Sequence, residues 1–267
     1  TPIWERRRML ITASQQPVFA SIKENLECLI DVLDTHPDSD WILTPEGSLS
    51  GYCANVCHEG TAEQKAEYFT ALTTLETYLQ QNKRSMALGT GHYEQDEFPY
   101  NQVRYYREGQ LVGAYNKQRL TRTTNGLGEH YYYMMGLESS LIELSGTGPR
   151  TGTLICNDAW AMPTASPLGD SYLFNEIAGE GACCVFVSAN CNTNTYSQNI
   201  YTWHENHLLT FAELHQMHIV VASASTDMIG GTVNHMQAPS GIIGPNGTWL
   251  AKCNDQGMDS VTMELDL

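Results

Sequence analysis

Residues 41–47 read Trp41-Ile42-Leu43-Thr44-Pro45-Glu46-Gly47, a short apolar run that ends in a carboxylate. Upstream, the apolar run over 9–13 predicts a strand, and apolar residues at helical spacing over 22–33 predict a helix. Strand, helix and strand together form a β-α-β unit, which is typical of α/β proteins. Glu46 is therefore expected at the end of a strand, where such folds usually display their chemical groups.

The alternation of strand-like and helix-like segments continues along the chain. The further segments that we expect are a helix over 61–81, a strand over 86–91, a strand over 182–188, a helix over 200–216 and a strand over 219–223. Hairpins are expected over 101–116 and 240–252, and loops over 126–128 and 146–152. The result is an α/β protein with mixed sheets covered by helices, and no linker divides residues 1–267, so we expect a single domain.

Composition and charge exclude several classes of function. The 267 residues are 42 % hydrophobic and carry 30 acidic against 14 basic side chains, a formal charge of −16. Such a charge repels nucleic acid and anionic membrane surfaces. No apolar run reaches the roughly 18 to 20 residues of a membrane span, and the run after Arg6-Arg7-Arg8 is too short for a signal core. We expect a cytoplasmic protein without nucleic-acid or membrane partners.

The eight cysteines and the nine histidines do not indicate a metal site. Cys53/Cys57 and Cys183/Cys184 lack the second pair that a structural zinc site requires, so reduced thiols are expected. The segment 204–207, His-Glu-Asn-His, places its histidines three apart instead of four, which does not fit a zinc-protease helix. We expect neither a metal nor another cofactor. On the helix over 200–216 we predict one aligned stripe of larger side chains: Ile200, Trp203, His207, Phe211 and Leu214.

Three short stretches supply a carboxylate, an ammonium and a thiol, each at the end of a strand-like run: 44–47, 115–118 and 154–158. A thiol with a pKa of about 8.5 needs a neighbouring base or cation to become a nucleophile. Glu46 is the candidate base for Cys156. Taken singly, each group has an ordinary alternative, as a turn carboxylate, a solvated lysine or an inert buried thiol. As an ordered set they indicate a cysteine hydrolase.

The order of these pieces, with their neighbours, resembles the nitrilase superfamily of carbon–nitrogen hydrolases. The pieces that carry the resemblance are Gln15-Gln16, Asn25-Leu26, Pro45-Glu46, Gly51-Tyr52, Asn116-Lys117, Gly128-Glu129, Ile155-Cys156 with Asp158, Ser240-Gly241-Ile242-Ile243 and Pro245-Asn246-Gly247. The resemblance implies a four-layer αββα sandwich and a Glu-Lys-Cys triad of Glu46, Lys117 and Cys156. It also implies that subunits pair into an eight-layer homodimer or a higher homo-oligomer.

In this interpretation Cys156 attacks an amide or nitrile carbon, and Glu46 takes the thiol proton, passes a proton to the leaving nitrogen and later activates water. Lys117 and the backbone N–H of Asn157 are expected to stabilise the oxyanion. Glu129 matches a second glutamate of the family, expected to hydrogen-bond Lys117 or to orient the substrate amine. The alternative for Glu129 is a carboxylate on a surface loop.

The substrate is the least determined feature of the sequence. The segment 157–163 after the thiol matches neither the nitrilase nor the carbamoyl-amine hydrolase pattern, whereas 129–136 resembles a loop of the latter. We therefore expect a small amide or carbamoyl amine, with a nitrile and a non-catalytic binding role as alternatives. The candidate substrate-contacting residues, which could equally be ordinary core or loop residues, are Tyr52, Trp160, Tyr132 and Asn192.

Overall fold

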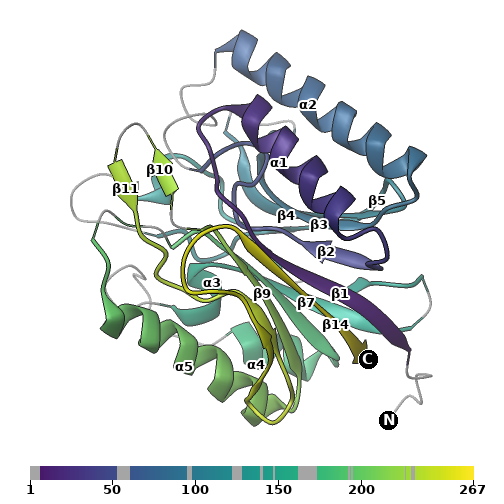
Figure 1. The fold of residues 1–267 in the computed structure, drawn as a ribbon, viewed down its shortest axis with the longest axis vertical. Coiled ribbons are helices and arrows are strands. Elements are labelled where there is room, and N and C mark those ends of the chain that lie inside the picture. The colour runs from purple at the N-terminus through teal and green to yellow at the C-terminus, as the bar shows by residue number, and fades with distance from the viewer. Residues whose placement is uncertain are drawn as a thin grey trace.

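The computed structural model describes most of the chain. The described residues are 7–52, 61–94, 98–121, 128–138, 141–146, 148–161, 173–191, 193, 195–225, 227–229 and 232–267. Two six-stranded sheets lie face to face, and helices cover the outer face of each sheet (Figure 1). The predicted four-layer αββα sandwich is confirmed.

The first sheet has the order β14-β1-β2-β3-β4-β5. Its strands are β1 (Arg8–Gln15), β2 (Trp41–Leu43), β3 (Met86–His92), β4 (Tyr100–Arg107), β5 (Gln110–Asn116) and β14 (Asp259–Asp266). β1, β2 and β3 run parallel, and β4 and β5 are added as an antiparallel hairpin. Since two reversals restore the direction, β5 ends at the same edge of the sheet as β2.

The second sheet has the order β13-β12-β9-β8-β7-β6. Its strands are β6 (Ile142–Glu143), β7 (Arg150–Ile155), β8 (Cys184–Ala189), β9 (His218–Ser223), β12 (Gly241–Ile243) and β13 (Trp249–Lys252). β7, β8 and β9 run parallel and are buried along nearly their whole length, as expected for strands covered on both faces. A separate antiparallel ribbon joins β10 (Asp227–Ile229) to β11 (Thr232–Asn234).

The helices form two layers, one on the outer face of each sheet. Their bounds are α1 (Ile22–Thr35), α2 (Ala62–Gln81), α3 (Asn157–Trp160), α4 (Leu173–Gly179) and α5 (Gln198–His215), with a 3₁₀ turn at Glu129–Tyr131. α1 and α2 cover the first sheet, and α4 and α5 cover the second (Figure 1). α2 begins with a capping box, in which Thr61 and Gln64 satisfy each other's backbone N–H groups. The face of α2 that carries Tyr68, Leu72 and Leu75 is buried.

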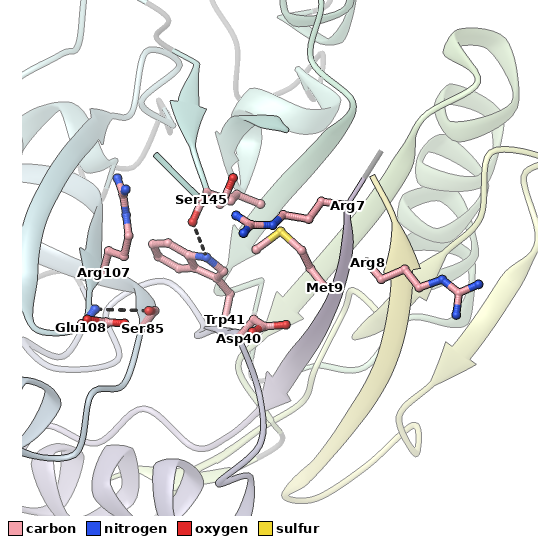
Figure 2. A pocket seen from close by; sticks show the side chains of 10 residues that line it. Arg7, Arg8, Met9, Asp40, Trp41, Ser85, Arg107, Glu108 and Ser145 are labelled. Carbon is pink, nitrogen blue, oxygen red and sulfur yellow. Dashed lines mark hydrogen bonds between the residues drawn. The ribbon is translucent and has the colours of Figure 1, made fainter. Parts of the chain in front are cut away.

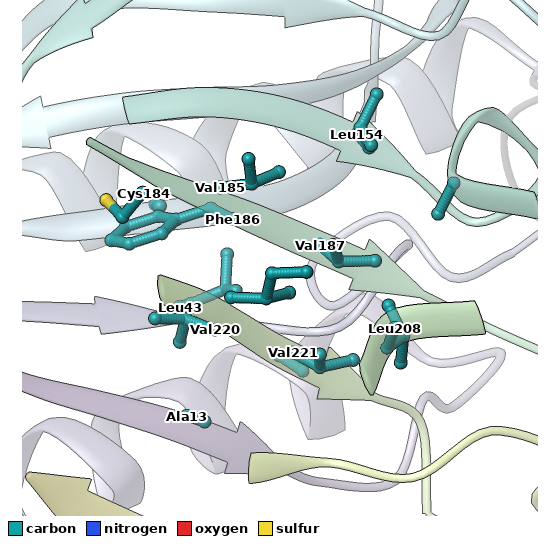
Figure 3. Packing of buried hydrophobic residues seen from close by; sticks show 14 of the residues in the cluster. Ala13, Leu43, Leu154, Cys184, Val185, Phe186, Val187, Leu208, Val220 and Val221 are labelled. Atoms are coloured by element: carbon teal, nitrogen blue, oxygen red, sulfur yellow. The ribbon is translucent and has the colours of Figure 1, made fainter. Parts of the chain in front are cut away.

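The main core fills the space between the two sheets (Figure 3). Ala13 and Leu43 from the first sheet face a row of β-branched and aromatic side chains from β8 and β9, such as Phe186 and Val220. Leu43, Phe186 and Val220 are fully buried, and each contributes roughly 1.5 to 3 kcal/mol by leaving water. The core therefore fixes the two sheets against each other, and with them the strand ends that both sheets present.

Two predictions about local structure were wrong. On α5 the stripe predicted to be one face is divided: Phe211 is buried, but Ile200 and Leu214 are 38 % and 66 % exposed. The buried face carries Leu208 and His204 instead, because large side chains occur all around this helix. Gly152, expected in a loop, lies within β7, where the missing side chain leaves room for a residue of α4.

β14, which the sequence did not reveal, pairs along the full length of β1. Backbone hydrogen bonds continue the pairing to Arg7 and Leu267, so the two ends of the described chain lie side by side (Figure 1). Among the described residues, no helix is long and apolar enough to cross a bilayer.

Candidate active site

Three predicted site residues lie at the same edge of the sandwich. Glu46 follows β2, Lys117 follows β5 and Cys156 follows β7. Contacts between the sheets join these strand ends: the Ser188 hydroxyl donates to the carbonyl of Thr44 at 2.9 Å. The three residues are far apart in the sequence but lie at one edge of the sandwich, because all three strands end there.

Glu46, Lys117 and Glu129 form a buried ion-pair cluster, called here the Glu–Lys–Glu cluster. Nζ of Lys117 donates to Oε1 of Glu46 and to Oε1 of Glu129, both at 2.7 Å. The side chain of Lys117 is fully buried, and both carboxylates are buried as well. Water is excluded, so the charges interact strongly, and each must be satisfied within the protein.

Neutral donors complete the cluster. Nδ2 of Asn101, on β4, donates to Oε1 of Glu46 at 2.6 Å and to Oε1 of Glu129 at 3.0 Å. The backbone N–H of Asn190, after β8, donates to Oε2 of Glu46 at 2.8 Å, and the N–H of Thr121 donates to Oε2 of Glu129 at 2.7 Å. Glu46 is therefore held by groups from both sheets, which fixes the direction of its carboxylate.

Burial and pairing give the three groups different proton affinities. Burial raises the pKa of Glu46 to about 7, against the opposing effect of Lys117. Burial acts the same way on Glu129, but Lys117 outweighs it and leaves the pKa of Glu129 below its ordinary value. Burial alone would lower the pKa of Lys117, yet the two carboxylates hold it well above its ordinary value. Glu46 is thus the member that can exchange a proton near neutral pH.

Cys156 occupies a sharp turn between β7 and α3. Its φ of 48° lies in the left-handed region, which is uncommon for a residue with a side chain, while its N–H donates to the carbonyl of Ser188 at 2.9 Å. Its Sγ lies 3.4 Å from Sγ of Cys191. The hydrogen bond with Cys191, together with burial, raises the pKa of the Cys156 thiol well above its ordinary value. The resting thiol is therefore protonated and needs a base.

Asp158 joins the strand end that carries Lys117 to the one that carries Cys156. Its Oδ1 accepts from the N–H groups of Gln118 and Arg119, at 3.2 and 2.6 Å. Its Oδ2 accepts from the N–H of Ile155 and the hydroxyl of Tyr115, at 3.1 and 3.0 Å. Two positions after Cys156, this carboxylate holds the first sheet to the second where the site is built.

The remaining predicted residues have varied surroundings. The Tyr52 hydroxyl donates to Oε1 of Glu129 at 3.2 Å. Nδ2 of Asn157, in the first turn of α3, donates to the carbonyl of Arg119 at 3.2 Å. Trp160 is buried, with its ring 4.4 Å from that of His204, and the half-buried Tyr132 packs beside a small apolar cluster.

One predicted site residue, Asn192, lies outside the described residues. Several contributors to the site were not given a role from the sequence, among them Asn101, Asp158, Asn190 and Cys191. Of these, only Asp158 had a signal in the sequence, its place two positions after the thiol.

The two histidines of the 204–207 segment have separate partners. Nδ1 of His204 lies 2.7 Å from the carbonyl of Gln237, and Nδ1 of His207 lies 3.1 Å from that of Trp203. Within the described ranges, no three His, Cys, Asp or Glu side chains form a group that could hold a metal ion.

A hollow of about 300 Å³ lies at the opposite edge of the sandwich (Figure 2). Met9, Trp41 and Ser85 line it from the starts of the parallel strands, and Arg107 lines it from the end of β4. Since the Glu–Lys–Glu cluster lies at the other ends of these strands, this hollow is separate from the candidate active site.

The sequence matches the family model described as carbon-nitrogen hydrolase over residues 10–267. The chain belongs to this family. A curated relative in sequence, the glutamine-dependent NAD(+) synthetase of Acinetobacter baylyi, is 24 % identical over 160 residues, which are 58 % of this chain and 28 % of that protein. The chain thus matches little more than a quarter of this larger relative.

Solved structures share the fold of this carbon–nitrogen hydrolase. The glutamine-dependent NAD+ synthetase of Acinetobacter baumannii superposes with a TM-score of 0.78 at 20 % identity, covering 97 % of this chain and 46 % of that chain. An amidase from Nesterenkonia sp. superposes with a TM-score of 0.77 at 18 % identity, covering 97 % of this chain and 90 % of that one. The predicted membership of the nitrilase superfamily is confirmed.

Proposed function

We propose that the protein is a thiol hydrolase that cleaves a non-peptide C–N bond of a small amide or carbamoyl amine and releases ammonia. The observation that carries this proposal is the buried Glu–Lys–Glu cluster at the strand ends that also present Cys156. The Cys191 contact and burial raise the pKa of the Cys156 thiol, and Glu46 raises it further while Lys117 lowers it, which supports a joint role for the three groups. Burial raises the pKa of Glu46 to about 7, which suits a group that must take and return a proton near neutral pH.

In the first half-reaction, Glu46 takes the Cys156 proton as the sulfur attacks the substrate carbon. The N–H of Asn157 and the ammonium of Lys117 stabilise the oxyanion, and each such donor typically contributes about 3 to 4 kcal/mol to lowering the barrier. Glu46 then passes the proton to the departing nitrogen, leaving a thioester on Cys156. Lys117 remains charged throughout, because the two carboxylates hold its pKa high.

In the second half-reaction, Glu46 activates a water that attacks the thioester and returns the proton to the thiol. The role of Glu129 is to balance the charge of Lys117 and, with Tyr52, to limit how Lys117 is oriented. Tyr132, Trp160 and Asn192 remain proposed substrate contacts.

Amides are favoured over nitriles as substrates because similar solved structures are amidases. L-glutamine is one of the amides to test, since the curated relative is glutamine-dependent. A nitrilase would use the same three residues. A non-catalytic binding role would require a misaligned triad or a closed pocket, and the intact set of Glu46, Lys117 and Cys156 at neighbouring strand ends argues against it.

The test is ammonia release from short amides, L-glutamine, carbamoyl amines and nitriles, with identification of each product. The proposal expects ammonia and a carboxylate from at least one amide or carbamoyl amine. Turnover of nitriles alone would replace this substrate class with the nitrilase alternative. Ammonia release from none of the four classes would favour the binding role.

We also propose that two subunits pair through the layer of α4 and α5. The outer face of α5 carries the exposed Leu214 and borders a hollow of about 540 Å³ lined by Trp203, His207 and Phe211. Apolar faces of this kind are typical of subunit contacts. A cytoplasmic location is proposed as well, supported by the six described cysteines, all of which are free thiols.

A further inference from the structure

Two thiols lie in contact beside the Glu–Lys–Glu cluster. The sulfur atoms of Cys156 and Cys191 are 3.4 Å apart. In a disulfide the S–S distance is about 2.05 Å, so the two atoms need to approach by only about 1.4 Å. Cys156 is buried and Cys191 is partly exposed, so the pair lies at the boundary between the core and the solvent.

The sheet itself brings the two thiols together. β7 and β8 are parallel neighbours in which Ile155 pairs with Ser188, and Cys156 continues this pairing through its N–H bond to Ser188. Cys191 lies in the connection that follows β8. The residue before it, Asn190, donates its N–H to Glu46. The contact between the thiols therefore follows from the strand register and from the group that holds the base, which makes it a built feature of the site.

We propose that Cys156 and Cys191 are a modification site at which a hydroperoxide forms a reversible disulfide, switching the hydrolase off. The Cys156 thiolate attacks the terminal peroxide oxygen, the O–O bond breaks, and Cys156 sulfenic acid is formed with hydroxide from hydrogen peroxide or an alkoxide from an organic hydroperoxide. The sulfur of Cys191 then attacks the sulfenic sulfur, the S–O bond breaks, and water leaves. The peroxide is reduced and two thiols are oxidised. This proposal rests on the proposed function for the identity of Cys156 as the nucleophile.

Glu46 serves the oxidation as it serves hydrolysis. A thiol reacts with peroxide as the thiolate, and Glu46 is the neighbouring group that can take its proton near neutral pH. Without a second thiol, further oxidation of a sulfenic acid gives a sulfinic acid, which thiol reductants do not reverse. By forming the disulfide, Cys191 prevents oxidation of Cys156 to the sulfinic acid, so a thiol reductant can restore the nucleophile.

The test is oxidation of the full chain with hydrogen peroxide, followed by alkylation and peptide mapping without reductant. Cleavage after glutamate and phenylalanine separates Cys156 from Cys191, and Cys191 from Cys183 and Cys184. We expect a Cys156–Cys191 cross-linked peptide and an intact mass lowered by two hydrogens. Dithiothreitol should remove the cross-link and restore any amide turnover.

Cys191→Ser should lack the cross-link and accumulate sulfinic acid on Cys156 under the same oxidation, while the matched control Cys253→Ser should keep the cross-link. A native chain that gives sulfinic acid at Cys156, or a cross-link from Cys156 to any other cysteine, would overturn the proposal. Peptide mapping needs no substrate. A cross-link in a chain without amide turnover would therefore contradict the proposed function and still support the disulfide.

Discussion

One ammonium group holds two buried carboxylates together in the site. Lys117 donates to both Glu46 and Glu129 at 2.7 Å, and all three side chains are buried. Removing the cation leaves two negative charges without compensation, which costs far more than losing an exposed ion pair. Burial raises the pKa of Glu46 and the contact with Lys117 limits the rise to about 7, so stability and proton transfer both depend on this cluster.

Lys117→Met should lower the free energy of unfolding by about 3 to 5 kcal/mol at pH 7. Urea denaturation measures this loss. The loss should shrink as the pH falls, because the two unpaired carboxylates then bind protons more readily in the folded than in the unfolded chain. The matched control is Lys252→Met, which removes a partly exposed pair with Glu205 and should cost about 1 kcal/mol or less. Equal losses in the two variants would contradict this account of the cluster.

The acidic limb of the pH profile should report Glu46. The pKa of Glu46 is raised to about 7, so kcat/KM should rise with pH through a midpoint near 7 as the carboxylate loses its proton. Lys117 should cause no loss of activity just above neutrality, because its pKa is held well above its ordinary value. Glu46→Gln should lower kcat/KM by about 10² to 10⁴-fold. A profile that is flat between pH 5.5 and 8 would refute the role of Glu46 as base.

Strand ends and their connections decide whether these residues meet. β2, β5 and β7 each end in a site residue, and Asp158 holds the ends of β5 and β7 together through four hydrogen bonds. Three of the four donors are backbone N–H groups, one buried and two part-buried, that would lose their partner without this carboxylate. The position of Lys117 relative to Cys156 therefore depends on a residue that does not react.

Asp158→Ala should lower the free energy of unfolding by about 3 kcal/mol, because the part-buried N–H groups of Gln118 and Arg119 and the buried N–H of Ile155 lose a charged acceptor. Chemical denaturation gives the value. Tyr115→Phe, which removes one of the four hydrogen bonds and leaves the backbone donors satisfied, should cost about 1 kcal/mol. A loss in Asp158→Ala no larger than in Tyr115→Phe would show that the carboxylate does not join the strands.

The β-α alternation could be predicted from the sequence because buried parallel strands are continuous apolar runs and α2 has one apolar face. β14 could not, since its residues are mostly half-buried and polar, and pairing with β1 defines it. The face of α5 was predicted wrongly because it carries large side chains on both sides. Asn101, Asn190 and Cys191 reach the site only through the packing of the sheets, which no local pattern reveals.

The helical layer of α4 and α5 exposes large apolar side chains beside a hollow. α5 exposes Leu214 and Ile200 on its outer face, next to the apolar hollow. α2, in the opposite layer, exposes Phe69 to 41 %, which makes it a comparable test of a surface apolar residue. The proposed pairing would bring the α4 and α5 layer of one subunit into contact with the same layer of its partner.

Leu214→Glu should shift the protein from dimer to monomer, because it would place a charge in an apolar contact. Sedimentation velocity at several concentrations measures the shift. The matched control, Phe69→Glu, should leave the dimer intact. A native chain that sediments as a monomer, or a dimer that persists in Leu214→Glu, would contradict this pairing.

Cys156 is the proposed nucleophile on which the hydrolase mechanism depends. Ammonia release should be compared for the native chain, Cys156→Ala and Cys253→Ala on the same panel of amides. Cys156→Ala should lose activity by about 10³-fold or more while Cys253→Ala keeps it, since only the first variant removes the attacking sulfur. Equal ammonia release from Cys156→Ala and the native chain would rule out Cys156 as the nucleophile.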